Sequence, residues 1–129
     1  MSVPRCLVDT SAWIETLRAD GREEVRAEVA GLVREGDCVT CDMILLELWA
    51  GARSDAQRKA LRELAEKSAW VETTPAVWVE ARELARRARS RGLTVPAADL
   101  LIAACAGHYG LRILAVDTHF DRLARLSET

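Results

Sequence analysis

Short apolar runs alternate with longer amphipathic segments along the chain, and this alternation constrains the fold more than any other feature. The apolar runs predict strands at 6–8, 38–40, 69–72 and 112–116. Apolar residues spaced by three or four predict helices at 11–20, 22–34, 43–51, 54–67, 75–90 and 97–108, with a short helix starting at Thr118. Asp42, Ser54 and Thr74 are the expected N-caps of the third, fourth and fifth of these helices. Strands that alternate with helices form parallel sheets with right-handed crossovers, so we expect an α/β fold.

The bulk composition indicates one soluble domain. The chain has 129 residues, half of them hydrophobic, and a net charge of −2. A charge so close to zero excludes a whole-protein field that attracts nucleic acid, so any such contact must use a local patch. The N-terminal residues lack the apolar core of a signal peptide, and no segment resembles a membrane span. We therefore expect a cytoplasmic protein without a membrane partner.

The cysteines are expected to be buried free thiols. All four lie in mostly apolar surroundings, at Cys6, Cys38, Cys41 and Cys105. The Cys38-x-x-Cys41 spacing is half of a zinc site, but no second pair of ligands follows it. The pattern therefore favours packing over zinc binding.

One carboxylate, Asp9, directly follows the predicted first strand. The run Leu7-Val8 leads into Asp9-Thr10-Ser11 and then into an amphipathic segment. In open α/β sheets, ligands bind at the carboxyl ends of the strands, which would place Asp9 in a site. Asp is also a good N-cap, so a purely structural role at the start of a helix remains open.

Three further carboxylates have similar settings. Glu47 lies in a segment that is apolar nearly all round, which predicts a buried helix and a carboxylate that needs a partner or a cation. Asp99 is the only charged residue between Leu93 and Leu111. Asp117 follows the predicted 112–116 strand. If these acids converge with Asp9, they cannot all ionise without cations, and all-oxygen ligands favour Mg²⁺ or Mn²⁺.

These segments together resemble the PIN-domain ribonucleases, and their spacing is similar to that of VapC-type toxins. The motifs are Leu7-Val8-Asp9-Thr10-Ser11, Glu47 in a Leu-rich helix, Pro96-Ala97-Ala98-Asp99 and Val116-Asp117-Thr118-His119-Phe120. The resemblance implies one PIN-like domain over residues 1–129. It implies a three-layer sandwich, with a parallel sheet of four or five strands flanked by about seven helices.

The resemblance also implies a function. It suggests the toxin of a type II toxin–antitoxin pair, a metal-dependent endoribonuclease that cleaves RNA by metal-activated water. By the same resemblance, Asp9, Glu47, Asp99 and Asp117 are the catalytic metal ligands for Mg²⁺ or Mn²⁺. The implied partners are the RNA substrate, a cognate antitoxin that lies over the acidic groove, and a second copy in a homodimer.

Several residues are assigned auxiliary roles. Ser11 matches a hydroxyl position often found near the metal in the family. Many members have Thr or Ser where this chain has Ala115, and Asp121 is a candidate helper for Asp117. We expect the last strand that is usual in the family, after 112–116, to be short or missing. The basic residues near 82–91 fit either a solvated helix face or an RNA-binding patch, for which the candidates are Arg82, Arg86 and Arg89.

The sequence also allows two alternative functions. A receiver-like signalling domain has an acidic Mg²⁺ site, but it needs a Lys after a late strand, and the only lysines are Lys59 and Lys67 in the predicted 54–67 helix. In a non-catalytic interaction module, the acids would only cap helices. The chain has four tryptophans, and some of its predicted helices are apolar on more than one side. These features also predict a homodimer and an apolar groove near the first four helices that binds a partner peptide.

Overall fold

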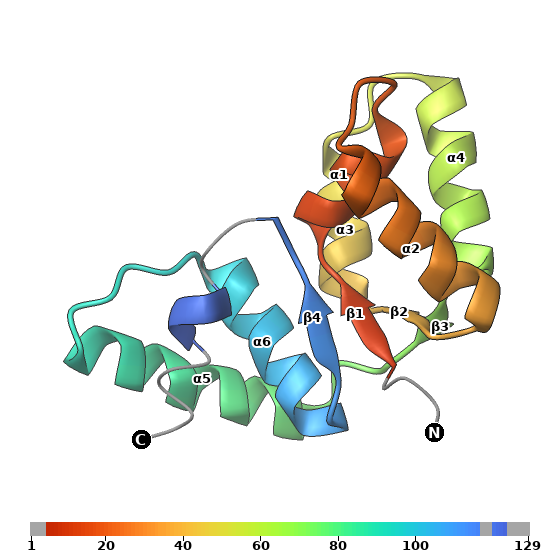
Figure 1. Cartoon of the computed structure of the whole chain (residues 1–129). Coiled ribbons are helices and arrows are strands. Elements are labelled where there is room, and N and C mark those ends of the chain that lie inside the picture. The colour runs from red at the N-terminus through yellow and green to blue at the C-terminus, as the bar shows by residue number, and fades with distance from the viewer. Residues whose placement is uncertain (1–4, 117–119, 124–129) are drawn as a thin grey trace.

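The centre of the molecule is a parallel sheet with strand order β3-β2-β1-β4 (Figure 1). The computed structural model describes residues 5–116 and 120–123. The strands are β1 (Cys6–Val8), β2 (Cys38–Thr40), β3 (Ala69–Trp70) and β4 (Arg112–Leu114). Every residue of β1 and β2 is buried, as expected for the middle strands of a parallel sheet that is covered on both faces.

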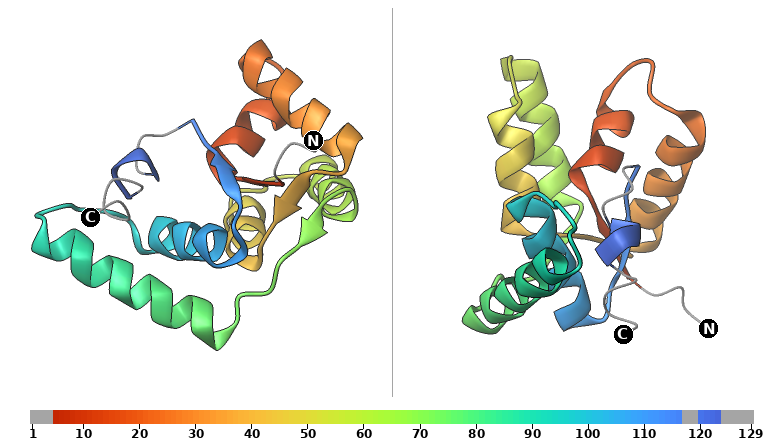
Figure 2. Two further views of the ribbon diagram at one scale, coloured as in Figure 1. Left: turned by 60° about the horizontal axis from the view of Figure 1, so that its bottom comes forward. Right: turned by 90° about the vertical axis from the view of Figure 1, so that its left-hand side faces the viewer.

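The helices form the outer layers of the fold. They are α1 (Thr10–Leu17), α2 (Glu23–Glu35), α3 (Asp42–Ala50), α4 (Asp55–Glu66), α5 (Pro75–Ser90) and α6 (Ala97–Tyr109), and residues 120–123 are also helical. In Figure 2, α1 and α2 lie on one side of the sheet and α5 and α6 on the other. The predicted three-layer α/β fold is therefore confirmed. No helix among residues 5–116 and 120–123 is long and apolar enough to cross a membrane.

Local signals placed most helix ends correctly. Ser54 Oγ accepts a hydrogen bond from the Gln57 amide at 3.1 Å at the start of α4. Thr74 Oγ1 accepts one from the Val77 amide at 3.4 Å at the start of α5, where Pro75 is the first helical residue. The cap predicted at Asp42 is wrong, since Asp42 is already helical and Cys41 is the N-cap.

The outer strands are shorter than predicted. β3 ends at Trp70 instead of residue 72, and β4 ends at Leu114 instead of residue 116. Within residues 5–116 and 120–123, each is paired on one side only, with β2 and β1 respectively. Those partners end at Thr40 and Val8, because α3 and α1 begin two residues farther along the chain, so the regular strand pairing stops there.

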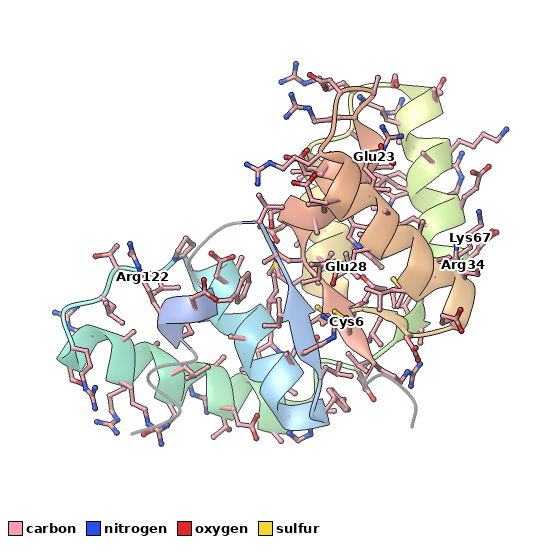
Figure 3. The ribbon with its side chains drawn as sticks, viewed as in Figure 1. Cys6, Glu23, Glu28, Arg34, Lys67 and Arg122 are labelled. Atoms are coloured by element: carbon pink, nitrogen blue, oxygen red, sulfur yellow. The ribbon has the colours of Figure 1, made fainter. Side chains whose placement is uncertain are left out.

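Helix α3 is not buried on all sides, which corrects the interpretation of its apolar sequence. Ile44, Leu45 and Leu48 face the core, but Leu46 is 61% exposed. Trp49 on the same helix is also exposed. Helix α2 follows the ordinary amphipathic pattern. Its Val29 and Leu32 are buried, while Glu23 and Arg34 extend from its outer surface (Figure 3).

Helix α1 ends at Leu17 instead of the predicted Asp20, because the chain turns sharply there. Arg18 adopts an extended conformation, and the segment folds back so that Gly21 lies against the Glu15 carbonyl. A Cβ at Gly21 would stand 1.7 Å from that oxygen. The residue is thus required by a close backbone approach.

We expect Gly21→Ala to destabilise the fold by about 1–3 kcal/mol, since either the loop or α1 must shift to accommodate the methyl group. Urea unfolding followed by circular dichroism measures this. The matched control is Gly107→Ala in α6, where an added Cβ meets no atom within 4 Å. That change should stabilise by about 0.5–1 kcal/mol through helix propensity. Equal effects of the two substitutions would contradict the close approach.

Candidate active site

Asp9 has both of the features that the sequence suggested: it follows a strand, and it caps a helix. It directly follows β1, and its backbone N–H donates to the Leu114 carbonyl at 2.9 Å, which continues the β1–β4 pairing. Its carboxylate also caps α1, because Oδ2 accepts the Ser11 amide at 3.0 Å. The residue is only 2% exposed. Capping and a place in a site are therefore compatible.

The Ser11 hydroxyl connects Asp9 to the chain beyond β4. It donates to Asp9 Oδ2 at 2.7 Å and accepts the backbone N–H of Val116 at 2.9 Å. Val116 is the residue before Asp117, which lies outside the described residues. Ser11 therefore holds the chain that leads to the fourth predicted acid close to the first one.

Glu47 is held by a residue that the sequence analysis missed. Its Oε1 accepts a hydrogen bond from Thr10 Oγ1 at 2.8 Å, across 37 positions of sequence. Thr10 is the neighbour of Asp9 and the first residue of α1, and α1 packs against α3. Glu47 is half-buried and lies beside the Asp9 segment. No local pattern around Thr10 indicates a partner on another helix.

Asp99 enters the same end of the sheet from the opposite layer. It lies in the first turn of α6 and is 9% exposed. Helix α6 runs antiparallel to β4, so its first turn lies near the carboxyl ends of β1 and β4 (Figure 1). The positive end of the helix dipole favours a carboxylate at this position. Helix α3 packs against both α1 and α6, between the elements that carry Asp9 and Asp99.

This donor set fits a hard divalent cation in its chemistry. Asp9 and Asp99 are buried carboxylates, Glu47 is a half-buried one, and oxygen is the ligand that Mg²⁺ and Mn²⁺ prefer. Among residues 5–116 and 120–123, however, no three acidic, His or Cys side chains form a group that could hold a metal. Asp117 is not among these residues, so convergence of all four acids stays a prediction.

A groove of about 870 Å³ lies beside Glu47, between α1, α3 and α4. Thr10 and Glu47 form part of its lining. The apolar part of the lining includes Ile14 and Leu17, which are each 43% exposed. Arg18 and Arg53 add positive charge to the lining. An apolar groove was predicted near the first four helices, and this one is formed by three of them.

Comparison with known proteins identifies the family. The profile of the PIN domain matches residues 6–126, which is nearly the whole chain. The chain belongs to the PIN-domain family. It is 35% identical over 125 residues to the VapC ribonuclease Mb1587 of Mycobacterium bovis, covering 94% of this chain and 92% of that protein.

Solved structures agree with this assignment of the PIN domain. FitAcB from Neisseria gonorrhoeae superimposes with a TM-score of 0.75 at 25% identity, over 93% of each chain. A toxin–antitoxin complex from Klebsiella pneumoniae superimposes with a TM-score of 0.71 at 17% identity, over 88% of this chain and 87% of that one. The latter likeness concerns the fold alone. Membership of this family removes the receiver-like alternative.

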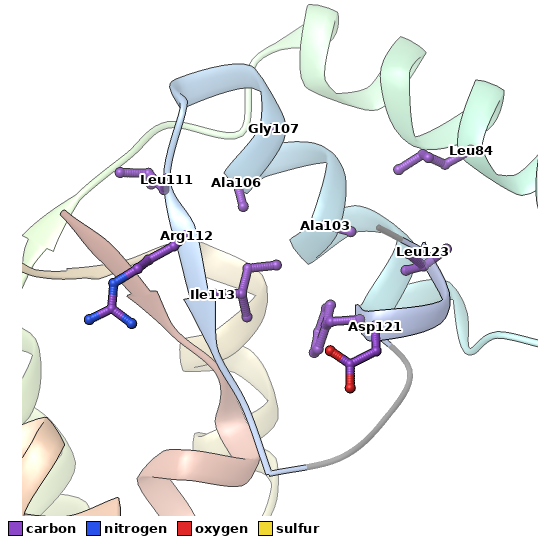
Figure 4. A pocket seen from close by; sticks show the side chains of 10 residues that line it. Leu84, Ala103, Ala106, Gly107, Leu111, Arg112, Ile113, Asp121 and Leu123 are labelled. Atoms are coloured by element: carbon purple, nitrogen blue, oxygen red, sulfur yellow. The ribbon is translucent and has the colours of Figure 1, made fainter. Parts of the chain in front are cut away.

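The remaining candidate residues are the arginines proposed for RNA binding and Asp121, and all of them are exposed at the surface. Arg82, Arg86 and Arg89 are exposed on α5, but Arg86 donates two hydrogen bonds to Glu83, at 3.2 and 2.6 Å. Much of the charge of Arg86 is therefore balanced locally. Asp121 is exposed and lines a cavity of about 320 Å³ between α5, α6 and β4 (Figure 4). The RNA-binding role of the arginines and the helper role of Asp121 stay predictions.

We expect Ser11→Ala to lower the free energy of unfolding by about 1–3 kcal/mol, since buried Asp9 loses a hydrogen bond and the Val116 amide loses its acceptor. Urea titration measures the loss. Ser11→Thr keeps the hydroxyl and should recover most of the stability. The control is Ser90→Ala, whose hydroxyl bonds only at the surface, with an effect within about 0.5 kcal/mol. A Ser11→Ala protein as stable as its parent would count against the connecting role.

Proposed function

We propose that this PIN domain is a Mg²⁺- or Mn²⁺-dependent endoribonuclease and the toxin of a type II toxin–antitoxin pair. The observation that carries the proposal is the placement of Asp9 and Asp99, two buried carboxylates that reach the same end of the sheet from opposite layers. The similar protein from Mycobacterium bovis is named a VapC ribonuclease. This name supports the same function here.

In this proposal Asp9, Glu47, Asp99 and Asp117 hold the cation. When bound, Mg²⁺ or Mn²⁺ supplies an activated water and offsets the negative charge that builds on the scissile phosphate. The contribution of the protein is to hold its carboxylates in place before the substrate arrives. Ser11 orients Asp9 through a hydrogen bond of 2.7 Å, and Thr10 orients Glu47 through one of 2.8 Å.

The groove between α1, α3 and α4 is the proposed seat of the antitoxin. It offers Ile14 and Leu17 to an apolar helix face, and Glu47 at its lining can attract a basic side chain from the partner. Arg18 and Arg53 favour acidic residues of the same partner. A peptide in this groove would lie next to Glu47, so it would block the approach of RNA to the site and thereby inhibit the enzyme.

A homodimer and an RNA-binding patch complete the proposed assembly. Several large apolar side chains are exposed outside the groove, and a second copy could cover them: Leu46, Trp49, Trp78 and Val79. Exposed Arg82 and Arg89 remain the better candidates for phosphate contact, because Arg86 is paired with Glu83.

We expect Asp9→Asn and Asp99→Asn each to lower RNA cleavage at least a hundredfold in Mn²⁺, because a misplaced cation loses both positioning and electrostatic stabilisation. Cleavage of total RNA with Mn²⁺, and with chelator, measures this. Mn²⁺ should raise the melting temperature of the parent and have little effect on either variant. Cleavage by the parent in chelator, or by either variant at the parental rate, would falsify the mechanism.

The matched control for the two substitutions is Asp55→Asn. Asp55 starts α4 at the surface, where it pairs with Arg58 at 2.6 Å. Its charge loss equals that at Asp9 and Asp99, so cleavage and the response to Mn²⁺ should stay at the parental level. If the acids only capped helices, Asp9→Asn would instead lower stability and reduce cleavage only in proportion.

We expect Ile14→Lys with Leu17→Lys to abolish inhibition by the antitoxin while RNA cleavage is retained. Ile14 and Leu17 are the exposed large apolar side chains of the groove, and a charge there cannot be buried without cost. The assay compares cleavage with and without the protein from the adjacent small reading frame. Ala27→Lys, at an exposed position on α2 outside the groove, serves as control and should remain inhibited. Full inhibition of the double variant would place the partner elsewhere.

A further inference from the structure

The groove between α1, α3 and α4 carries more positive than negative charge. Among the described residues that line it, the charged ones are Arg18, Arg53 and Glu47. Glu47 is one of the proposed metal ligands, so its charge would be offset by the bound cation. The two arginines then form a local basic patch on a chain whose net charge is −2. A chain without an overall positive charge needs such a patch to bind RNA.

The two arginines of the groove differ in what their side chains contact. Arg18 Nε lies 3.3 Å from Asp20 Oδ1, so part of its charge is balanced by a neighbouring carboxylate. Arg53 is exposed, and its guanidinium forms no ion pair with any acid in residues 5–116 and 120–123. Of the two, Arg53 therefore offers the charge that is more readily available to a ligand.

Several arginines outside the groove are paired with nearby acids, unlike Arg53. With N···O distances between 2.6 and 3.9 Å, the pairs join Arg22 to Glu15, Arg58 to Asp55, Arg86 and Arg87 to Glu83, and Arg112 to Glu28. A paired guanidinium gains less from a phosphate, because it must first give up its carboxylate. Arg82 and Arg89 are exposed on α5, but they do not line this groove. Arg53 combines an available charge with a place beside Glu47.

The backbone of Arg53 is held by Gln57. The Arg53 N–H donates to Gln57 Oε1 at 2.5 Å, and the Gln57 N–H donates to Ser54 Oγ at 3.1 Å. These two hydrogen bonds fix the turn that leads from α3 into α4. The Arg53 side chain therefore starts from a fixed position at the groove, which reduces the freedom that it loses on binding a ligand.

We propose that Arg53 binds a phosphate of the RNA strand in this groove, other than the phosphate that is cleaved. A guanidinium presents paired N–H donors that match two phosphate oxygens. Glu47 and Arg53 line the same groove, so a strand that reaches the acids can extend to Arg53. The inference rests on the proposed ribonuclease function. It assigns substrate binding to Arg53 and no part in the chemical step.

The same contact explains how a protein partner in the groove would exclude RNA. A carboxylate also presents two oxygens to a guanidinium, as a phosphate does. An acidic side chain of the antitoxin would therefore take the place of the RNA phosphate on Arg53. RNA and the antitoxin should compete for this residue.

The test measures the binding of a short fluorescein-labelled single-stranded RNA of random sequence by fluorescence anisotropy. The Asp99→Asn protein is the background, so that the RNA stays intact. Adding Arg53→Ala should weaken binding about tenfold. It should also lower the slope of log K against log salt concentration by about 0.7, since one phosphate contact to a single strand is lost. Arg53→Lys should keep the parental slope and recover only part of the affinity, because Lys lacks the paired donors.

The matched control is Arg62→Ala. Arg62 is exposed on α4 outside the groove, so its substitution removes the same charge from the neighbouring helix. RNA binding should stay within about twofold of the parent, because a distant exposed charge is screened by salt. Both Ala variants should melt at the parental temperature, which excludes an effect through unfolding.

Kinetics in the otherwise unchanged protein separate this inference from the proposed function. With Mn²⁺, Arg53→Ala should raise KM about tenfold and leave kcat within about twofold, as expected when binding is lost but chemistry is not. No cleavage by the parent would contradict the proposed function, whereas the anisotropy measurement tests Arg53 without any cleavage.

Two outcomes would overturn the role of Arg53. The first is equal weakening of RNA binding by Arg53→Ala and Arg62→Ala, which would show an effect of overall charge alone. The second is unchanged RNA binding by Arg53→Ala together with weaker inhibition by the antitoxin. In that case Arg53 would contact the protein partner and not the RNA.

Discussion

The site depends on how the central strand β1 ends. At that point the backbone of Asp9 continues the pairing with β4, while its side chain turns into the start of α1. A carboxylate that is almost fully buried is tolerated only when hydrogen bonds replace its lost hydration. The amide and hydroxyl of Ser11 supply two of them. The Ser11 hydroxyl then uses its acceptor capacity on Val116, so one side chain joins three parts of the fold.

The parallel sheet explains why acids from distant segments reach one end of the molecule. All strands run the same way, so each strand that ends there delivers the next residue to the same edge. Helix α6 returns antiparallel to β4 and brings its first turn, with Asp99, to that edge as well. Helix α3 packs against α1 and α6 and contributes Glu47 from between them. Asp9, Glu47 and Asp99 therefore come from three different parts of the fold, each within or directly beside a helix.

The apolar residues of α3 illustrate how a sequence pattern can describe a surface without identifying its neighbour. Its run of leucines predicted burial on all sides, but Leu46 and Trp49 are exposed while the opposite face packs in the core. An exposed apolar face on a helix beside the site is suited to an interface. The apolar character of α3 could be predicted from the sequence, but which of its faces is exposed could not.

The sequence by itself determined the α/β class, the buried strands β1 and β2, the caps at Ser54 and Thr74, and the placement of Asp9 after a strand. These features follow from contacts within a few residues and from hydrophobic periodicity, which a chain carries locally. Only the tertiary structure decided the Thr10–Glu47 and Ser11–Val116 hydrogen bonds and the early ends of β3 and β4. Each of these joins residues far apart in the chain, and periodicity specifies which face of an element is buried but not which residue of another element lies against it.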